Sequence, residues 1–170
     1  SLRFQYEYNE ETGQGKASAF LERHDYPLQL RTAVCDFSLR VPGTFTTPRR
    51  GVQSGRRGAY IYIDWLNNLV TREESVYRGL DFDEKQLVKR LGHRLLCYVI
   101  RRLLVDEYLT RTSMMILQRG DDKDGKRLED YYKSIGFDSY ALSGHNPADP
   151  FPYRYSKTAM EVPVSRFMKH

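Results

Sequence analysis

The sequence contains little cysteine and no long apolar run. Its two cysteines, Cys35 and Cys97, both lie in apolar surroundings. We therefore expect buried free thiols in the cytoplasm or another reducing intracellular compartment, and not a disulfide framework. No stretch approaches the roughly 20 consecutive apolar residues that a membrane-spanning helix needs, and the first residues do not resemble a signal peptide. The composition excludes a small disulfide-stapled domain and predicts no membrane partner.

The residues that are present have the make-up of a globular domain, with 40% hydrophobic and 29% charged residues. A length of 170 residues suffices to bury a hydrophobic core, so we expect a single domain over residues 1–170. The net charge of +5 favours anionic partners, among them nucleic acid, phosphate-rich cosubstrates and acidic surfaces. Composition alone does not choose among these partners.

Strand patterns fill the first part of the chain. Residues 2–8 alternate between apolar and polar side chains, and apolar segments follow at residues 17–24 and 28–39; such patterns are typical of β-strands. Residues 59–66 are apolar nearly throughout, so we expect a central strand that is covered on both faces. Asp64 interrupts this run, and a carboxylate there either has a partner or a function, or lies at a strand end with access to water.

A basic loop precedes that central strand. Residues 40–58 are rich in glycine and proline, which predicts a loop. Such a loop is able to grip phosphate groups, which would favour nucleic acid or another acidic partner, although loops of this composition are more often simply solvated. Its arginines are Arg49, Arg50, Arg56 and Arg57.

The second half of the sequence alternates helices and strands. Asp81 and Glu84 form a capping-box pattern, and apolar residues then recur at helical spacing over residues 87–108. Gly92 interrupts this pattern, which predicts a break after which the main helix begins. Residues 114–117 are apolar and predict a short buried strand.

A short helix follows that strand and ends at Gly136, a typical helix-terminating residue. Further strands are expected at residues 139–142 and 158–167, although Pro163 keeps part of the second off a central ladder. Together the elements predict an α/β (α+β) fold in which a mixed, mostly antiparallel sheet is flanked by helices. The side chains predicted to share the buried side of the short helix are Leu128, Tyr131, Tyr132 and Ile135.

Three of these features, in this order, resemble the GNAT superfamily of N-acetyltransferases. They are the strong strand ending at Leu66, the basic segment 89–94 (KRLGHR) that leads into the long helix, and the short helix that ends in YYKSIGF (131–137). The resemblance covers residues 59–137 as motifs and the last strands as a pattern. It implies a GNAT-like fold and an acyl-CoA-dependent N-acetyltransferase. The cosubstrate would be acetyl-CoA, and the acceptor an amine on a small molecule or a protein.

The resemblance also implies roles for individual residues. Tyr132, five positions before Phe137, corresponds to the tyrosine that protonates the leaving thiolate, and Asp64 would be a base that acts through water. The pantetheine pairs with backbone groups at the strand end, and the pyrophosphate lies on amides at the N-terminus of the following helix. The residues in contact with acetyl-CoA would be Leu66, Asn67, Lys89, Arg90, Gly92, His93 and Arg94.

Some residues depart from the family pattern. Arg94 stands where the phosphate segment usually has a very small residue, and residues 77–79 (YRG) are a second candidate for the opening of that segment. The helices that usually follow the family's first strand are not evident. Tyr132 is as compatible with packing as with acid catalysis, and Lys89 and its basic neighbours are compatible with a solvated helix face.

These departures leave a second function open. The chain would then be a catalytically inactive GNAT-like component of a larger assembly, associated with nucleic acid through the loop arginines. A metal site is not predicted: His93 and Cys97 are four residues apart on the expected helix, but no second pair of ligands is in view.

Overall fold

The structure is a computed structural model that describes residues 1–22, 30–41, 47–48, 59–72, 78–119, 125–139 and 158–169. Its strands are β1 (Leu2–Asn9), β2 (Gln14–Leu21), β3 (Leu30–Arg40), β4 (Tyr60–Asn68), β5 (Met114–Gln118), β6 (Asp138–Ser139) and β7 (Ala159–Pro163). They form one seven-stranded sheet in the order β1-β2-β3-β4-β5-β7-β6. Neighbouring strands are antiparallel except β4 and β5, which are parallel. The predicted mixed, mostly antiparallel sheet is confirmed.

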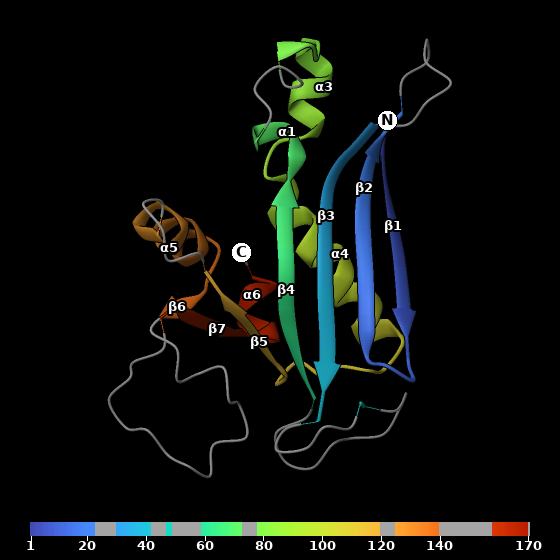
Figure 1. Cartoon of the computed structure of the whole chain (residues 1–170), viewed down its shortest axis with the longest axis vertical. Coiled ribbons are helices and arrows are strands. Elements are labelled where there is room, and N and C mark those ends of the chain that lie inside the picture. The colour runs from blue at the N-terminus through green and yellow to red at the C-terminus, as the bar shows by residue number, and fades with distance from the viewer. Residues whose placement is uncertain are drawn as a thin grey trace.

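Helices lie along one face and at the ends of this sheet (Figure 1). None of the helices in the described segments is long and apolar enough to cross a bilayer. The helices are α1 (Leu69–Arg72), α3 (Phe82–Leu87), α4 (Leu91–Val105), α5 (Gly125–Ser134) and α6 (Val164–Phe167).

The first four strands form an antiparallel meander. β1 and β2 are joined by a tight turn in which Gly13 has a φ angle of +71°, a value that few residues other than glycine adopt readily. The two strands pair down to Asn9 and Gln14, so β2 begins earlier than the predicted strand at residues 17–24. β1 leads directly into β2 through this turn. The helices that were not evident in the sequence after the first strand are therefore also absent between β1 and β2 in the fold, where every residue is described.

Local hydrogen bonds set the helix boundaries around the predicted break. The Asp81 carboxylate accepts from the Glu84 backbone N–H at 2.8 Å, and the Glu84 carboxylate accepts from the Asp81 N–H at 3.1 Å. The predicted capping box therefore starts α3. Arg90, with φ of 53° and ψ of 35°, separates α3 from α4. The predicted break is confirmed, just before Gly92.

The end of the chain differs from the prediction. β7 stops at Pro163 and α6 follows, so the strand expected over residues 158–167 is wrong in its second half. Proline has no N–H to continue a ladder, and its fixed φ suits the residue before a helix. The strand expected at residues 139–142 begins as β6, but residues 140–157 lie outside the described part of the chain.

The main core lies between the sheet and α4. In Figure 1 this helix runs behind β2, β3 and β4, and no described helix covers the front face of β1 to β3. Side chains alternate between the two faces of a strand, so every second residue of each strand enters the core. The fully buried core side chains include Phe37, Leu39, Ile61, Leu95, Leu96, Leu103, Met115 and Phe137.

β4 is covered on both faces only in its first half. Tyr60 and Ile61 are both buried, in two different apolar clusters, as expected for a central strand. The prediction is wrong beyond that point, because Asp64 is exposed and Trp65 is 52% exposed. The cause is a change in strand pairing, which also shapes the candidate site.

Candidate active site

β4 and β5 part from each other in the middle of the sheet. Their parallel pairing starts at Ile61 and ends at Ile63, opposite Leu117, whereas β4 continues to Asn68. In the described part of the chain, no strand pairs with this edge of β4 beyond Ile63. We call the region between residues 64–68 of β4 and the end of β5 the β4–β5 gap.

A β-bulge marks the start of this gap. Phe37 of β3 pairs with Ile63 of β4. The next pair joins Asp36 and Trp65, so Asp64 is the extra residue of the bulge. A bulge increases the local twist of a strand and re-aims side chains. This explains why β4 turns away from β5 at this position.

The Asp64 carboxylate lies on the sheet face opposite α4. The Ser38 hydroxyl donates a hydrogen bond to its Oδ2 atom at 2.7 Å. Partial burial raises the pKa of Asp64, the hydrogen bond from Ser38 opposes this, and the neighbouring carboxylate of Asp36 adds to the increase. A carboxylate with a raised pKa is a better proton acceptor, so the position predicted for the base has a suitable environment.

The N-terminus of α4 opens toward the same region. Arg90, the residue before α4, has a left-handed backbone conformation, and its side chain makes no capping hydrogen bond. The first helical hydrogen bond is made by the Arg94 N–H, which donates to the Arg90 carbonyl at 3.0 Å. Within the described residues, no acceptor is found for the N–H groups of Leu91 and Gly92. These amides and the helix dipole form a local site of positive potential.

Gly92 is a meeting point of three elements. A Cβ atom added there would lie 3.1 Å from the Tyr131 hydroxyl oxygen of α5 and 3.7 Å from Leu66 Cδ2 of β4. The absence of a side chain at Gly92 thus lets α4, α5 and the edge of β4 approach one another. The structure brings Leu66 and Gly92 together as the resemblance implies, and it adds Tyr131.

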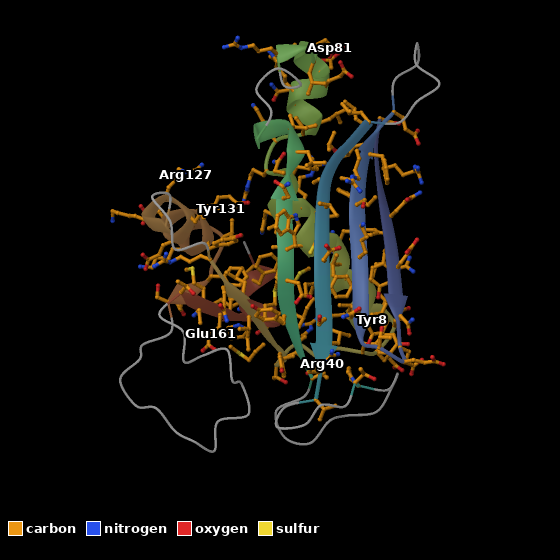
Figure 2. The ribbon with its side chains drawn as sticks, viewed as in Figure 1. Tyr8, Arg40, Asp81, Arg127, Tyr131 and Glu161 are labelled. Carbon is orange, nitrogen blue, oxygen red and sulfur yellow. The ribbon has the colours of Figure 1, made fainter. Side chains whose placement is uncertain are left out.

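Tyr131 is the residue of this site that the sequence did not identify. It was expected on the buried side of α5, but it is 40% exposed and lies on the side of α5 toward β4 (Figure 2). Burial of its phenol raises the pKa of Tyr131, and the nearby Arg90 guanidinium opposes this shift. The double tyrosine in YYKSIGF was the available signal.

Tyr132 is held in place by the end of α5. The Phe137 N–H donates to the Tyr132 carbonyl at 3.0 Å, and the Gly136 N–H donates to the Lys133 carbonyl at 3.1 Å. With Gly136 at a φ of +106°, this is a Schellman motif. Its usual apolar contact is present, because the rings of Tyr132 and Phe137 lie 5.7 Å apart. The ending that carried the resemblance therefore fixes the tyrosine locally.

The phenol of Tyr132 packs against the main core. Burial raises its pKa to about 12, and the neighbouring Tyr131 and Cys35 groups add to the increase. Cys35 pairs with Leu66 across β3 and β4, so the phenol lies near the part of β4 that borders the gap. Asp64 and Tyr132 therefore approach the gap from opposite sides of the sheet. The phenol is protonated at neutral pH and is able to donate a proton.

The basic residues around the start of α4 have different environments. Lys89 and Arg90 are exposed. The Arg94 guanidinium instead donates to the backbone carbonyls of Leu87 and Lys89, and so it turns back onto the preceding loop and away from the amides at the start of α4. The large side chain at this position is thereby accommodated.

His93 belongs to the core side of α4. It is 6% exposed, its ring lies 5.1 Å from that of Phe167, and its Nδ1 atom is 3.3 Å from Arg90 Nη2. Cys97 Sγ is 3.7 Å from His93 Nε2, but burial raises the pKa of Cys97 and makes the thiolate less accessible. The ring of His93 is therefore buried against the core, with Arg90 as a polar neighbour.

The remaining predicted residues lie at the end of β4 or outside the described part of the chain. Asn67 is half-buried on β4, one position before the strand ends at Asn68. The arginines Arg49, Arg50, Arg56 and Arg57 lie outside the described residues, as does Tyr77. Their predicted roles stay predictions.

Comparison with known proteins identifies similar folds. No family model and no curated protein matches the sequence. The crystal structure of the KacTA–DNA complex is similar with a TM-score of 0.51 and 9% identity, over 92% of this chain and 71% of that chain. The crystal structure of AtaTR bound with AcCoA is similar with a TM-score of 0.50 and 10% identity, over 91% of this chain and 70% of that chain. At these identities the likeness shows the fold, which is mixed α+β and GNAT-like.

Proposed function

We propose that the chain is an acyl-CoA-dependent N-acetyltransferase that acts on an amine. The observation that carries the proposal is the convergence at the β4–β5 gap. The edge of β4 beyond Ile63, which no described strand pairs, the first amides of α4 and Tyr131 of α5 meet there at Gly92, and Tyr132 follows Tyr131 in the same helix. The acetyl-CoA bound in the similar AtaTR structure supports acetyl-CoA as the cosubstrate.

The residues of the gap suit the parts of acetyl-CoA. The edge of β4 at Leu66 and Asn67 offers backbone groups for the amides of the pantetheine arm. The amides of Leu91 and Gly92, with the exposed charges of Lys89 and Arg90, suit a pyrophosphate. Phosphate recognition would rest on backbone amides, because the Arg94 guanidinium is held by the loop carbonyls.

The proposed reaction is a direct transfer. The amine nitrogen attacks the thioester carbon, so that an N–C bond forms and the C–S bond breaks. The proton of the amine passes to Asp64, through water, and the leaving thiolate takes a proton from the Tyr132 phenol. With a pKa of about 12, Tyr132 keeps its proton at neutral pH, so the phenol is available to hydrogen-bond to the sulfur as the C–S bond breaks and to donate its proton there.

The adjacent tyrosines give a matched test of this role. We expect Tyr132→Phe to lower turnover by about 10²–10⁴-fold, the usual contribution of a general acid, and to leave acetyl-CoA affinity nearly unchanged. Tyr131→Phe, which removes the same atom from the neighbouring residue, should have a smaller effect on turnover. Calorimetry with acetyl-CoA measures binding, and release of free CoA thiol with a panel of primary amines measures turnover.

The outcomes separate the enzyme from the inactive alternative. Absence of acetyl-CoA binding at millimolar concentration would overturn the proposal and favour a GNAT-like component of an assembly. Equal loss of turnover in the two tyrosine variants would argue against Tyr132 as the acid while leaving the acetyltransferase in place.

A further inference from the structure

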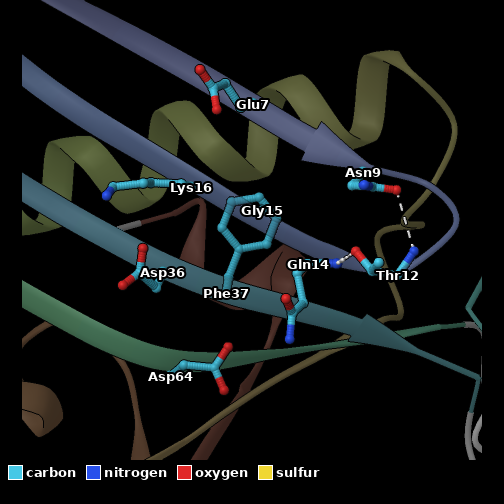
Figure 3. Close-up of a pocket in the computed structure, with 9 residues that line it drawn as sticks. All are labelled: Glu7, Asn9, Thr12, Gln14, Gly15, Lys16, Asp36, Phe37 and Asp64. Carbon is cyan, nitrogen blue, oxygen red and sulfur yellow. Dashed lines mark hydrogen bonds between the residues drawn. The ribbon is translucent and has the colours of Figure 1, made fainter.

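A hollow lies on the sheet face opposite α4, next to the β4–β5 gap. It is a cavity of about 560 Å³, a size typical of small-molecule sites. It reaches the gap at Asp64, because this residue directly follows the last β4 residue that pairs with β5. We call it the charged trough. Its charged residues, one from each of four neighbouring strands, are Glu7, Lys16, Asp36 and Asp64 (Figure 3).

The charges of the trough form a row across the sheet. Glu7 pairs in register with Lys16, and Lys16 pairs with Asp36, so their side chains are nearest neighbours on one face. In the described part of the chain, none of these three side chains forms an ion pair with another. Among the lining side chains, three carboxylates against one ammonium group give a negative balance, and the Arg40 guanidinium, which is not a lining residue, partly offsets the charge at Asp64.

A negative trough beside an acyl-transfer site favours a cationic ligand. A metal ion is not the expected cation, because the described residues contain no group of three or more His, Cys, Asp or Glu side chains arranged to hold one. The Lys16 ammonium group in the same row would also oppose a compact divalent ion. The chemistry of the trough therefore favours an organic cation.

Trp65 supports this choice independently of the carboxylates. Its register partner is Asp36, so its side chain lies on the trough face, and it is 52% exposed. Trp65 is not one of the lining residues, but it directly follows Asp64 in β4 and is the register partner of Asp36. From this border of the trough, an indole offers an apolar surface to a hydrocarbon chain and a π-face to a positive charge.

We propose that the charged trough binds a small aliphatic amine as its ammonium ion. The ammonium group lies between Asp36 and Asp64, and the hydrocarbon portion lies along Trp65. That this amine is the acetyl acceptor rests on the proposed function; the binding itself does not. Before transfer, the ammonium ion loses one proton through Asp64 to the solvent. The neutral nitrogen then attacks the thioester carbon at the adjoining gap, its second proton passes to Asp64, and the leaving thiolate takes the proton of Tyr132.

The test uses the tryptophan of the site. Trp65 is the only tryptophan of the sequence, so its fluorescence reports on the trough without a label. Titration with 1,4-diaminobutane, in the absence of acetyl-CoA, should give a saturable change. Added salt should weaken the response, because the carboxylates are partly exposed. The neutral analogue butane-1,4-diol should give no saturable change.

Two variants of the trough should act in opposite directions. Asp36→Asn removes an attractive charge and should weaken binding about fivefold, whereas Lys16→Gln removes a repulsive charge and should tighten it about fivefold. A gain of affinity in Lys16→Gln does not arise from misfolding. Asp130→Asn, which removes an exposed carboxylate of α5, should leave the affinity unchanged.

The outcomes are distinct from those of the proposed function. If acetyl-CoA binds but Trp65 does not respond to 1,4-diaminobutane, the trough is overturned and the acetyltransferase stands. A saturable response without acetyl-CoA binding would support the trough and overturn the acetyltransferase. Equal responses to the diamine and the diol, or the same affinity in Asp36→Asn and Lys16→Gln, would overturn recognition of an ammonium group.

Discussion

On one face of the sheet, Phe37 packs in a fully buried core against α4, while its chain neighbour Asp36 lies on the other face among exposed charges. The same contrast separates Ile63, which is buried, from Asp64, which is exposed. The strands are shared, but one face is apolar and covered by a helix. The other face is charged and, in the described residues of β1 to β3, without a helix over it.

The difference follows from the alternation of side chains along a strand. Residues on the α4 face have to fill a closed volume, so their size and shape determine stability. Residues on the opposite face are released from that constraint and are available for binding. The two faces are therefore expected to respond to substitution in different ways, and three substitutions test this expectation.

The largest effect is expected on the covered face. Leu96 of α4 is fully buried, whereas Val105 of the same helix is 76% exposed. Leu96→Ala should lower the free energy of unfolding by about 2–5 kcal/mol, because the cavity left behind cannot close completely. Val105→Ala, the matched control, should change it by no more than about 0.5 kcal/mol. Urea unfolding of both variants measures the difference, and similar values would contradict the assignment of the two sides of α4.

A smaller loss of stability is expected for a substitution at Gly15, where β2 places no side chain on the face toward α4. Gly15 pairs with Tyr8 and Phe37, whose rings stack 6.3 Å apart, and a Cβ atom at Gly15 would lie 2.2 Å from Phe37 Cζ. Gly15→Ala should cost about 1–3 kcal/mol of unfolding free energy through overpacking.

A smaller side chain at position 37 should relieve this clash. Combining Gly15→Ala with Phe37→Leu should cost less than the sum of the two single changes, since the smaller side chain makes room for the added methyl group. Thermal unfolding of the four proteins in this cycle gives the coupling. Simple additivity would show that the ring does not lie against Gly15.

The smallest effect concerns Asp64 on the charged face. Its pKa is raised above the ordinary value of 3.8 in the folded chain, so the folded state holds this proton more tightly than the unfolded state does. This contribution to stability is present below the ordinary pKa and is lost as the pH rises through the folded pKa. Asp64→Asn should remove this pH dependence and be neutral or slightly stabilising at neutral pH.

Unfolding in urea at several pH values in the acid range measures this change. The Ser38 hydroxyl donates to Asp64 at 2.7 Å, and an asparagine at position 64 still offers it an oxygen. The comparison therefore isolates the effect of the carboxylate charge. A variant that is less stable at neutral pH but unchanged in acid would show that the carboxylate is stabilising, contrary to its environment.

Local patterns were sufficient for most element boundaries. The capping box at Asp81 and Glu84 and the glycine end at Gly136 were predicted and are present, since their hydrogen bonds join residues no more than five positions apart in the chain. The last predicted strand ends early at Pro163, which has no N–H to continue the ladder and whose fixed φ suits the residue before α6.

For the candidate site, the residues near Leu66, Gly92 and Tyr132 were identified from the order of motifs. The approach of Tyr131 to Gly92 was not predicted, because the spacing of apolar residues places both tyrosines on one side of α5. Their separation depends on the approach of Gly92, whose missing side chain leaves space for the Tyr131 hydroxyl group. No local pattern contains that information.

The sequence by itself determined the strands, the helix ends and the alternation that makes one face apolar and the other polar, because each depends on residues close together in the chain. The tertiary structure alone decided the bulge that isolates Asp64, the parting of β4 from β5, and the meeting of four strands in the charged trough. These features are set by register between segments distant in the sequence, and register is fixed only when the core against α4 is packed.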